Sequence, residues 1–395
     1  MKFKSAKQIL KTAGITALLF IAAGLVSPLA AETVTSVSDV KDTLQSATIE
    51  DKKDASASGN TAIDVNLITD LKMGSALEMS IDNLQDLNKI LAEIIKYEPS
   101  IVKKPANVKV SFWQSLTGKQ PLEYFLAQGY EEFQKGDYTA AYNLFKYALK
   151  KDPLNKQALY YIALCKMSQG QVKEAITMVT KLRDRIKDEI WQKAFKAETD
   201  PWVEAQVAFK IGGFDSLETY KKKIAAGNRK ELHSDEYYAK YVNKNTWQYY
   251  SKEAQQEYNS IAGIDCGGLV QRVYMDLCKK NGITPPFNSK MPGDELTNKK
   301  YSKQIKDDGL IPPLSTKPGD FIILKEHDGW GHAFYFAGRD SDGRALIVEA
   351  SGEGKVLARP MPDRYYAYYE GTYKFNDMDK IREKTIQASV TKKDS

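Results

Sequence analysis

The sequence predicts an α+β protein in which an all-helical region precedes a C-terminal domain built around an antiparallel sheet. Residues 122–189 repeat a pattern of small and large apolar side chains, which indicates paired helices. After a predicted helix that begins near Asp265, short apolar runs alternate with glycine and proline, as is typical of strands and turns. Helices followed by strands, rather than alternating with them, favour the α+β class.

Length and composition are those of a globular protein. The chain has 395 residues, enough for two or more domains, with 42% hydrophobic and 27% charged residues. The formal net charge of +6 fits weak affinity for anionic surfaces such as cell-wall polymers. Because no zinc-finger spacing or phosphate-binding glycine loop is present, we do not expect nucleic acid as a partner.

The first 31 residues have the organisation of a secretory signal peptide. Four lysines in the first eleven residues precede an apolar stretch over 12–26, and small residues follow up to Ala31. A membrane anchor is the alternative, but the stretch is short for a span and no stop-transfer pattern follows. We therefore expect cleavage near Ala30 or Ala31, no transmembrane span afterwards, and a secreted or envelope location in the periplasm or cell wall.

Two segments separate the signal peptide from the repeat. Residues 32–62 are rich in serine, threonine, aspartate and lysine, which predicts a disordered spacer. Residues 63–121 form the next segment, and apolar side chains at helical spacing up to Tyr97 predict a helical region there.

The repeat over 122–189 has two copies offset by 34 residues. The first copy carries Gly129, Gly136, Ala141, Phe145 and Ala148, and the second carries Ala163, Gly170, Ala175, Val179 and Leu182. Small residues at these positions let two helices approach closely. The pattern resembles the tetratricopeptide repeat, which implies a groove for a protein partner or a helical spacer. Since two copies are few, we expect residues 85–97 and 200–225 to cap them.

The rest of the chain divides into a connector, a sheet domain and a tail. Residues 190–234 are predicted to be a helical connector, with breaks at Asp200-Pro201 and Gly212-Gly213. Residues 235–376 are predicted to form the sheet domain, with its strands as a meander, and residues 377–395 a polar, loose tail. The expected strands are 321–324, 333–336, 345–348, 356–358 and 373–375.

Cys266 is the strongest candidate for a nucleophile. The chain has three cysteines, Cys165, Cys266 and Cys278, so at least one thiol is free. If Asp265 caps the following helix, Cys266 lies in its first turn, where the N–H groups favour a thiolate and can hold an oxyanion. Gly267 and Gly268 would leave room for a substrate backbone. A buried structural cysteine is the alternative.

A thiol hydrolase also needs a base, for which histidine is suited near neutral pH. His332 begins a predicted strand and is favoured over His327, which lies in a turn, and over His233, which we expect at the surface. Glu349 interrupts the next apolar run and is a candidate to orient the imidazole. An outward-facing strand glutamate is the alternative.

Together these motifs resemble the NlpC-type family of papain-like bacterial cell-wall cysteine peptidases. The resemblance covers about residues 235–375 and includes Lys317-Pro318-Gly319-Asp320-Phe321. It implies a Cys-bearing helix on an antiparallel sheet, and hydrolysis of peptide bonds in peptidoglycan stems, often between D-glutamate and the diamino acid. It also implies Cys266 as nucleophile, His332 as base, Glu349 at the third polar position, and Asp265 in substrate binding.

The sequence departs from this family at two positions. Gly267 stands where a serine is common, and in some members that serine and the preceding aspartate help to recognise a free stem-peptide amine. Glu349 stands where histidine is most frequent. The family also has an active-site tyrosine before the cysteine, for which Tyr249, Tyr250 and Tyr258 are all candidates.

Two further groups surround these positions. Gln271 and Arg272 are expected on the exposed face of the Cys266 helix. A cluster of tyrosines either covers the sheet or lines a substrate cleft. Its members are Tyr365, Tyr366, Tyr368 and Tyr369.

The sequence thus predicts an exported cysteine endopeptidase that acts on peptidoglycan peptides through a Cys266 thioester and needs no metal or cofactor. Two alternatives remain open. One is a non-catalytic envelope protein that uses the repeats to bind a partner. The other is a thiol amidase or transferase that acts on an amide outside the wall.

Overall fold

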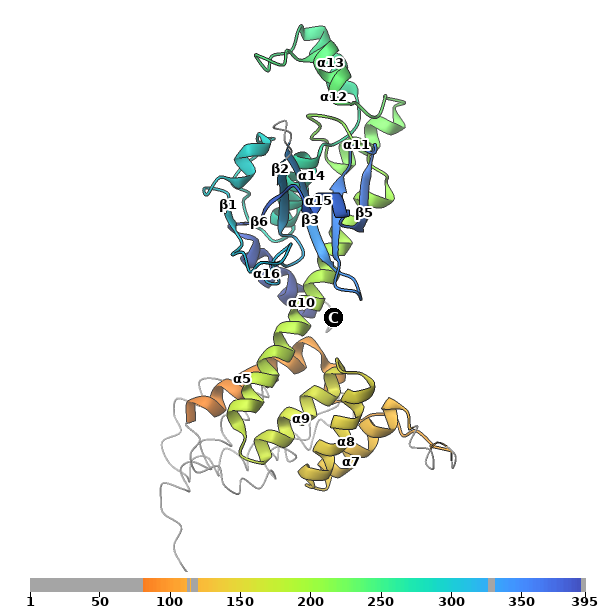
Figure 1. The fold of residues 1–395 in the computed structure, drawn as a ribbon, viewed down its shortest axis with the longest axis vertical. Coiled ribbons are helices and arrows are strands. Elements are labelled where there is room, and N and C mark those ends of the chain that lie inside the picture. The colour runs from red at the N-terminus through yellow and green to blue at the C-terminus, as the bar shows by residue number, and fades with distance from the viewer. Residues whose placement is uncertain (1–80, 112–113, 115–119, 326–330, 392–395) are drawn as a thin grey trace, which may run out of the picture. The chain divides into compact units, whose positions relative to one another are not determined.

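The computed structural model describes residues 81–111, 114, 120–325 and 331–391. The expected signal peptide over 1–31 and spacer over 32–62 lie outside the described residues. The chain falls into two compact units that divide after Lys187 (Figure 1).

The described part of the first unit consists of helices, as the repeat predicts. Its elements are α5 (Ile81–Tyr97), the 3-10 helix η2 (Pro99–Val102), α7 (Leu122–Gln134), α8 (Tyr138–Lys151), α9 (Lys156–Ser168) and the first part of α10 (Val172–Glu204). Asp137 caps α8 by accepting a hydrogen bond from the Ala140 N–H, and Asn155 caps α9 in the same way. Gly136 and Gly170, 34 positions apart, adopt φ of +81° and +80° directly after α7 and α9.

The repeat positions form the core between these helices. Ala141, Phe145 and Ala163 are buried, as are Ala175 and Val179. A Cβ atom on Gly129 would lie 2.9 Å from the Phe145 ring, so glycine permits the close approach of α7 and α8. The predicted division into small and large positions is confirmed.

Helix α5 and the following η2 flank the repeat, and Glu93 on α5 lies 3.5 Å from Arg183 on α10. Gln157 donates a hydrogen bond to the Ile101 carbonyl at 3.1 Å, and the Lys156 ammonium lies 3.1 Å from the Glu98 carboxylate. Leu87 and Ile94 on α5 are buried. Residues 85–97 therefore flank the repeat as expected, whereas residues 200–225 belong to the second unit.

Helix α10 continues through Pro201, although Asp200-Pro201 was expected to end a helix. A proline inside a helix removes one backbone hydrogen bond and costs about 3 kcal/mol. The large side chains on this stretch offset that cost, because Trp191, Phe195 and Trp202 are each about 1% exposed. Tertiary packing thus overrides the local signal.

The second unit is built on a six-stranded antiparallel sheet (Figure 1). Its strands are β1 (Ser302–Gln304), β2 (Phe321–Lys325), β3 (Gly331–Arg339), β4 (Ala345–Ala350), β5 (Val356–Pro360) and β6 (Tyr369–Phe375). The five expected strands are all present, and β1 is an addition. The order β1-β6-β2-β3-β4-β5 brings β6 back beside β2, so the sheet is not the simple meander that was expected.

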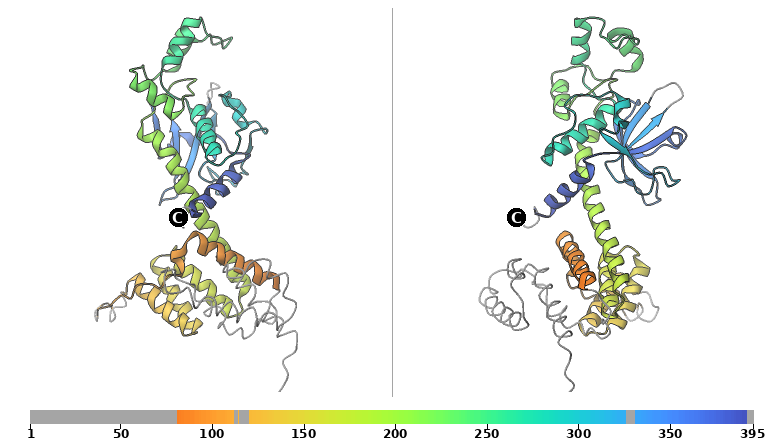
Figure 2. Two further views of the ribbon diagram at one scale, coloured as in Figure 1. Left: turned by 180° about the vertical axis from the view of Figure 1, so that it is seen from behind. Right: turned by 90° about the vertical axis from the view of Figure 1, so that its left-hand side faces the viewer.

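The second unit also contains helices. They are α11 (Leu217–Ala225), α12 (Ser234–Glu236), η3 (Tyr237–Tyr241), α13 (Lys252–Ser260), α14 (Cys266–Lys280), η4 (Gly293–Thr297), α15 (Asp363–Tyr366) and α16 (Met378–Thr391). Two views show α14 and the end of α10 on one face of the sheet (Figure 2). Tyr335 on β3 joins both, since its hydroxyl donates to the Val270 carbonyl at 2.5 Å and its ring lies 5.2 Å from Phe195. This packing fixes the start of α14 relative to the strands.

The segment before α14 belongs to the same unit. The Ile264 N–H donates to the Ala208 carbonyl at 3.0 Å, and the Val356 N–H donates to the Val207 carbonyl at 2.8 Å. The expected boundary between a connector over 190–234 and a domain over 235–376 is therefore wrong. The unit begins at Asp188 and includes that connector.

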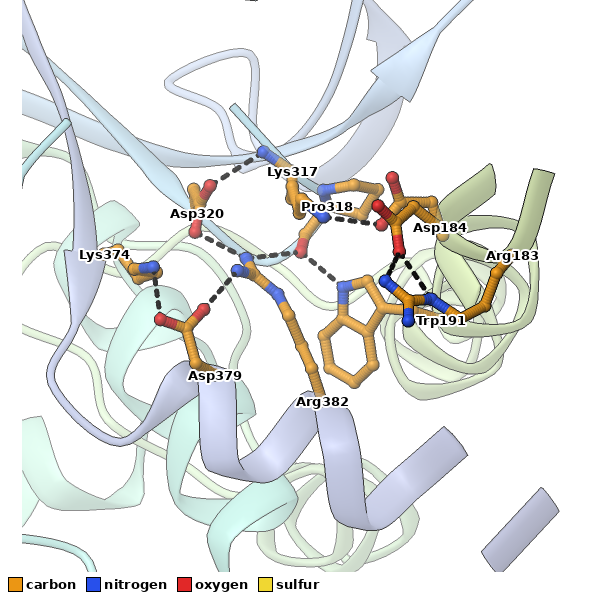
Figure 3. Close-up of polar contacts among 10 residues, drawn as sticks. Arg183, Asp184, Trp191, Lys317, Pro318, Asp320, Lys374, Asp379 and Arg382 are labelled. Atoms are coloured by element: carbon orange, nitrogen blue, oxygen red, sulfur yellow. Dashed lines mark hydrogen bonds and ion pairs between the residues drawn. The ribbon is translucent and has the colours of Figure 1, made fainter. Parts of the chain in front are cut away.

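The expected polar tail is also wrong, because most of residues 377–395 form α16. Met378, Ile381 and Ile386 are buried on one side of this helix. Arg382, itself 8% exposed, donates to the Asp320 carboxylate at 2.5 Å and to the Pro318 carbonyl at 3.1 Å (Figure 3). The helix is thereby attached to the turn that leads into β2.

Candidate active site

Cys266 is the first residue of α14, and Asp265 caps that helix. The Asp265 Oδ1 atom accepts a hydrogen bond from the Gly268 N–H at 2.6 Å, and the Asp265 carbonyl accepts from the Leu269 N–H at 2.9 Å. The predicted cap is confirmed. By helix geometry, the N–H groups of Cys266 and Gly267 remain available to a group that binds in front of the helix. Cys266 itself is partly exposed.

The two glycines after Cys266 have different surroundings. A Cβ atom on Gly268 would lie 2.4 Å from the Gly213 carbonyl oxygen, so this glycine is required by packing within the protein. A Cβ atom on Gly267 would meet nothing closer than 3.8 Å. The expectation that both glycines leave room for a substrate is therefore wrong for Gly268 and remains open for Gly267.

His332 lies near the beginning of β3, between Cys266 and Glu349. Its Nε2 atom is 2.6 Å from the Glu349 Oε2 atom, and the ring also interacts electrostatically with the Cys266 side chain. Since Nε2 is bound to the carboxylate, Nδ1 is the ring nitrogen left to exchange a proton with the thiol. The structure thus brings together Cys266, His332 and Glu349, the three residues predicted to be catalytic.

The charges around His332 favour the imidazolium form. Burial lowers the pKa of His332, but hydrogen bonds and charge interactions with Cys266 and Glu349 outweigh burial and raise this pKa to about 10. The side chain remains 18% exposed, so part of the ring is accessible. A ring held in this way can stabilise a thiolate and carries a proton that it can transfer.

Glu349 is fully buried and is held by three neighbours. Besides His332, it accepts a hydrogen bond from Arg359 Nε at 2.7 Å and from the Tyr365 hydroxyl at 2.8 Å. Burial raises the pKa of Glu349, but the hydrogen bond and charge of His332, with Tyr365 and Arg359, lower it overall. The alternative of an outward-facing strand glutamate is therefore wrong.

Three residues around the site were missed as contributors by the sequence analysis. Arg359 on β5 and Tyr365 on α15 bind Glu349, and Lys290 pairs with Asp265. Tyr365 belonged to the tyrosine cluster that was expected either to cover the sheet or to line a cleft. No local pattern in the sequence identifies Arg359 or Lys290.

The other two histidines are His233 and His327. His233 is exposed, as expected, and its ring stacks at 6.4 Å from Phe209. His327 lies outside the described residues.

Of the three candidate tyrosines, Tyr258 is the one that is buried. It donates a hydrogen bond to the Ile211 carbonyl at 3.2 Å, and its ring lies 4.0 Å from the Lys210 ammonium. It also interacts electrostatically with Asp265. Tyr249 neighbours Tyr258 at 5.5 Å, whereas Tyr250 is exposed.

Gln271 and Arg272 do not form an exposed helix face, which corrects that expectation. Gln271 is fully buried, and its amide donates to the Met291 carbonyl at 3.0 Å and accepts from the Met291 N–H at 2.7 Å. Arg272 donates to the Phe214 carbonyl at 2.7 Å. Through these hydrogen bonds, both residues bind the loops that contain Met291 and Phe214 to the first turns of α14.

The other two thiols differ from Cys266 in exposure. Cys165 and Cys278 are buried and free, and burial raises the pKa of Cys165 to about 12 and that of Cys278 to about 11. Cys266 alone among the three is partly exposed and next to an imidazole. Within the described part of the chain, no group of three or more His, Cys, Asp or Glu side chains is arranged to hold a metal ion.

Comparison with known proteins identifies the repeat. The tetratricopeptide repeat family matches residues 132–198. No curated protein and no solved structure matches the chain. Among the helices of the described residues, none is both long and apolar enough to cross a membrane. The chain therefore contains a helical tetratricopeptide repeat region, which is followed by an antiparallel six-stranded sheet.

Proposed function

We propose that this chain is an exported cysteine peptidase that hydrolyses peptide bonds in peptidoglycan stem peptides. The observation that carries the proposal is that His332 is bound to the buried Glu349 and interacts with Cys266 at the start of α14. The resemblance of residues 235–375 to NlpC-type peptidases supplies the substrate class.

The reaction proceeds in two halves. The Cys266 thiolate attacks the carbonyl carbon of the scissile bond, and the resulting oxyanion is stabilised by the N–H groups of Cys266 and Gly267. The His332 imidazolium gives its proton to the leaving amine as the C–N bond breaks, which leaves a thioester. Neutral His332 then takes a proton from water, the hydroxide adds to the thioester, and the thiolate is released with a carboxylic acid product.

Glu349 acts through His332 rather than on the substrate. Its carboxylate fixes the orientation of the ring and stabilises the imidazolium, while Arg359 and Tyr365 hold the carboxylate in place. No step requires a metal or a cofactor.

The test is digestion of purified peptidoglycan with the wild-type protein and with Cys266→Ala, followed by mass spectrometry of the products. We expect new stem-peptide fragments from the wild type alone. Iodoacetamide should label Cys266 well below pH 8 and should spare Cys165 and Cys278, which act as internal controls. Absence of fragments together with an unreactive Cys266 would exclude the proposal.

A second function, binding of a protein partner, is favoured by the repeat match at residues 132–198. Tetratricopeptide repeats commonly present a groove to a peptide. In this role the C-terminal unit would be a non-catalytic wall-binding module. Wall binding without product formation, unchanged by Cys266→Ala, would favour this function. A scan of protein and amide substrates would identify an amidase or transferase instead.

A further inference from the structure

The carboxylate next to the nucleophile is already neutralised within the protein. Asp265 directly precedes Cys266, its Oδ1 atom accepts the Gly268 N–H, and its Oδ2 atom is paired with the Lys290 ammonium. The Asp265 side chain is 14% exposed and that of Lys290 is 28% exposed, so the pair is partly shielded from water. Both carboxylate oxygens are therefore engaged before a substrate arrives.

The surrounding charges reinforce this effect. Lys210 interacts electrostatically with two ion pairs, Lys223–Asp215 and Lys290–Asp265, so that three lysines and two aspartates are grouped around the residue that precedes Cys266. Lys210 is buried and its ammonium donates to the Ile261 carbonyl at 2.9 Å. The excess of positive charge opposes the approach of a cationic group and favours oxygen acceptors.

The side chains of the first turn offer no alternative acceptor for an ammonium group. Gly267 has no side chain, and the Gly268 position is filled by the Gly213 carbonyl. A substrate ammonium would have to displace Lys290 from Asp265. Lys290, in contrast, has three N–H donors and gives one to Asp265, so the others can donate to a carbonyl or carboxylate oxygen.

We propose that Lys290 makes this site selective for stem peptides whose N-terminal nitrogen is acylated, as in stems still attached to the sugar strand, over peptides with a free N-terminal amine. This inference rests on the proposed peptidase function. The acylated nitrogen carries no charge, and its acyl oxygen can accept a hydrogen bond from Lys290.

The experiment compares two synthetic substrates, a stem tetrapeptide with a free N-terminal amine and the same peptide N-acetylated. We expect wild-type kcat/KM to be at least about tenfold higher for the acetylated peptide, as one charge-assisted hydrogen bond would produce. Lys290→Met should reduce this ratio at least about tenfold, because Asp265 becomes free to bind the amine. Lys290→Arg keeps the charge and should keep the preference.

Lys299→Met is the matched control, since Lys299 is an exposed lysine on the same stretch of chain and should leave the ratio unchanged. A wild-type preference for the free amine, or an unchanged ratio in a folded Lys290→Met, overturns this inference alone. If Lys290→Met does not fold, the wild-type ratio decides. Failure of the wild type to cleave either peptide overturns the proposed function and this inference with it.

Discussion

At the scale of single residues, the neighbouring Gly267 and Gly268 differ in whether the structure has room for a side chain. We expect Gly268→Ala to lower the free energy of unfolding by at least about 2 kcal/mol, because its Cβ would collide with the rigid Gly213 carbonyl. Gly267→Ala should leave stability unchanged or raise it by up to about 1 kcal/mol, since alanine favours the helix. Urea unfolding of the two variants measures both effects. Equal stability losses would show that the close approach of Gly213 does not matter.

His332 should make stability depend on pH in a defined direction. Its pKa in the folded protein, about 10, exceeds the ordinary value near 6.5, so its contribution is complete below about pH 6.5 and is lost as pH rises towards 10. The stability advantage of the wild type over His332→Gln should therefore shrink by up to about 1.4 kcal/mol per pH unit in this window. Unfolding curves at several pH values measure it. A constant difference between the two proteins would contradict the assignment.

The residues of the site differ in how far the sequence identifies them. Cys266 and Asp265 are predictable because a helix cap and its first turn are local. Glu349 could be proposed because it interrupts an apolar strand. Arg359 and Lys290 could not, since each acts through a partner at least ten positions away, and pairing at that distance depends on the fold.

At the scale of elements, the ion pair between Arg382 and Asp320 fastens α16 to the sheet (Figure 3). We expect Arg382→Ala to lower the free energy of unfolding by about 3 kcal/mol, because it leaves a buried carboxylate without its partner. Burial already raises the pKa of Asp320, and the loss of Arg382 raises it further, so the penalty should shrink as acid protonates Asp320.

The matched control for this pair is Lys380→Ala, an exposed position on the same helix, which should change stability by less than about 0.5 kcal/mol. Thermal unfolding at neutral and acidic pH compares the two variants. If Arg382→Ala behaves like Lys380→Ala, α16 is held by its apolar side chains alone.

Helices and strands were predicted correctly where their sequence pattern is local. The predictions were wrong where tertiary contacts determine whether a segment is helical. The repeat helices follow from glycines and alanines at a fixed period, and the strands follow from apolar runs between turns. α16 was misjudged because its buried Met378 and Ile386 stand among many charged residues. Pro201 indicated a helix end, but the burial of Trp202 keeps α10 continuous.

At the scale of the whole molecule, the boundary of the second unit decides which part of the chain can support the site. The sequence predicts this boundary near residue 235. In the structure, however, Val207 hydrogen-bonds to Val356, and Ala208 hydrogen-bonds to Ile264. Ile264 is two residues before Cys266. Residues 190–234 are therefore needed to hold the start of α14, which a composition-based boundary cannot reveal.

Two fragments test this boundary. A fragment of residues 188–395 should unfold cooperatively in urea and keep a Cys266 that reacts with iodoacetamide below pH 8. A fragment of residues 235–395 should lose cooperative unfolding and should expose Cys278 to the same reagent, because it lacks the backbone partners of Ile264 and Val356. A shorter fragment that folds and keeps Cys278 protected would restore the boundary near residue 235.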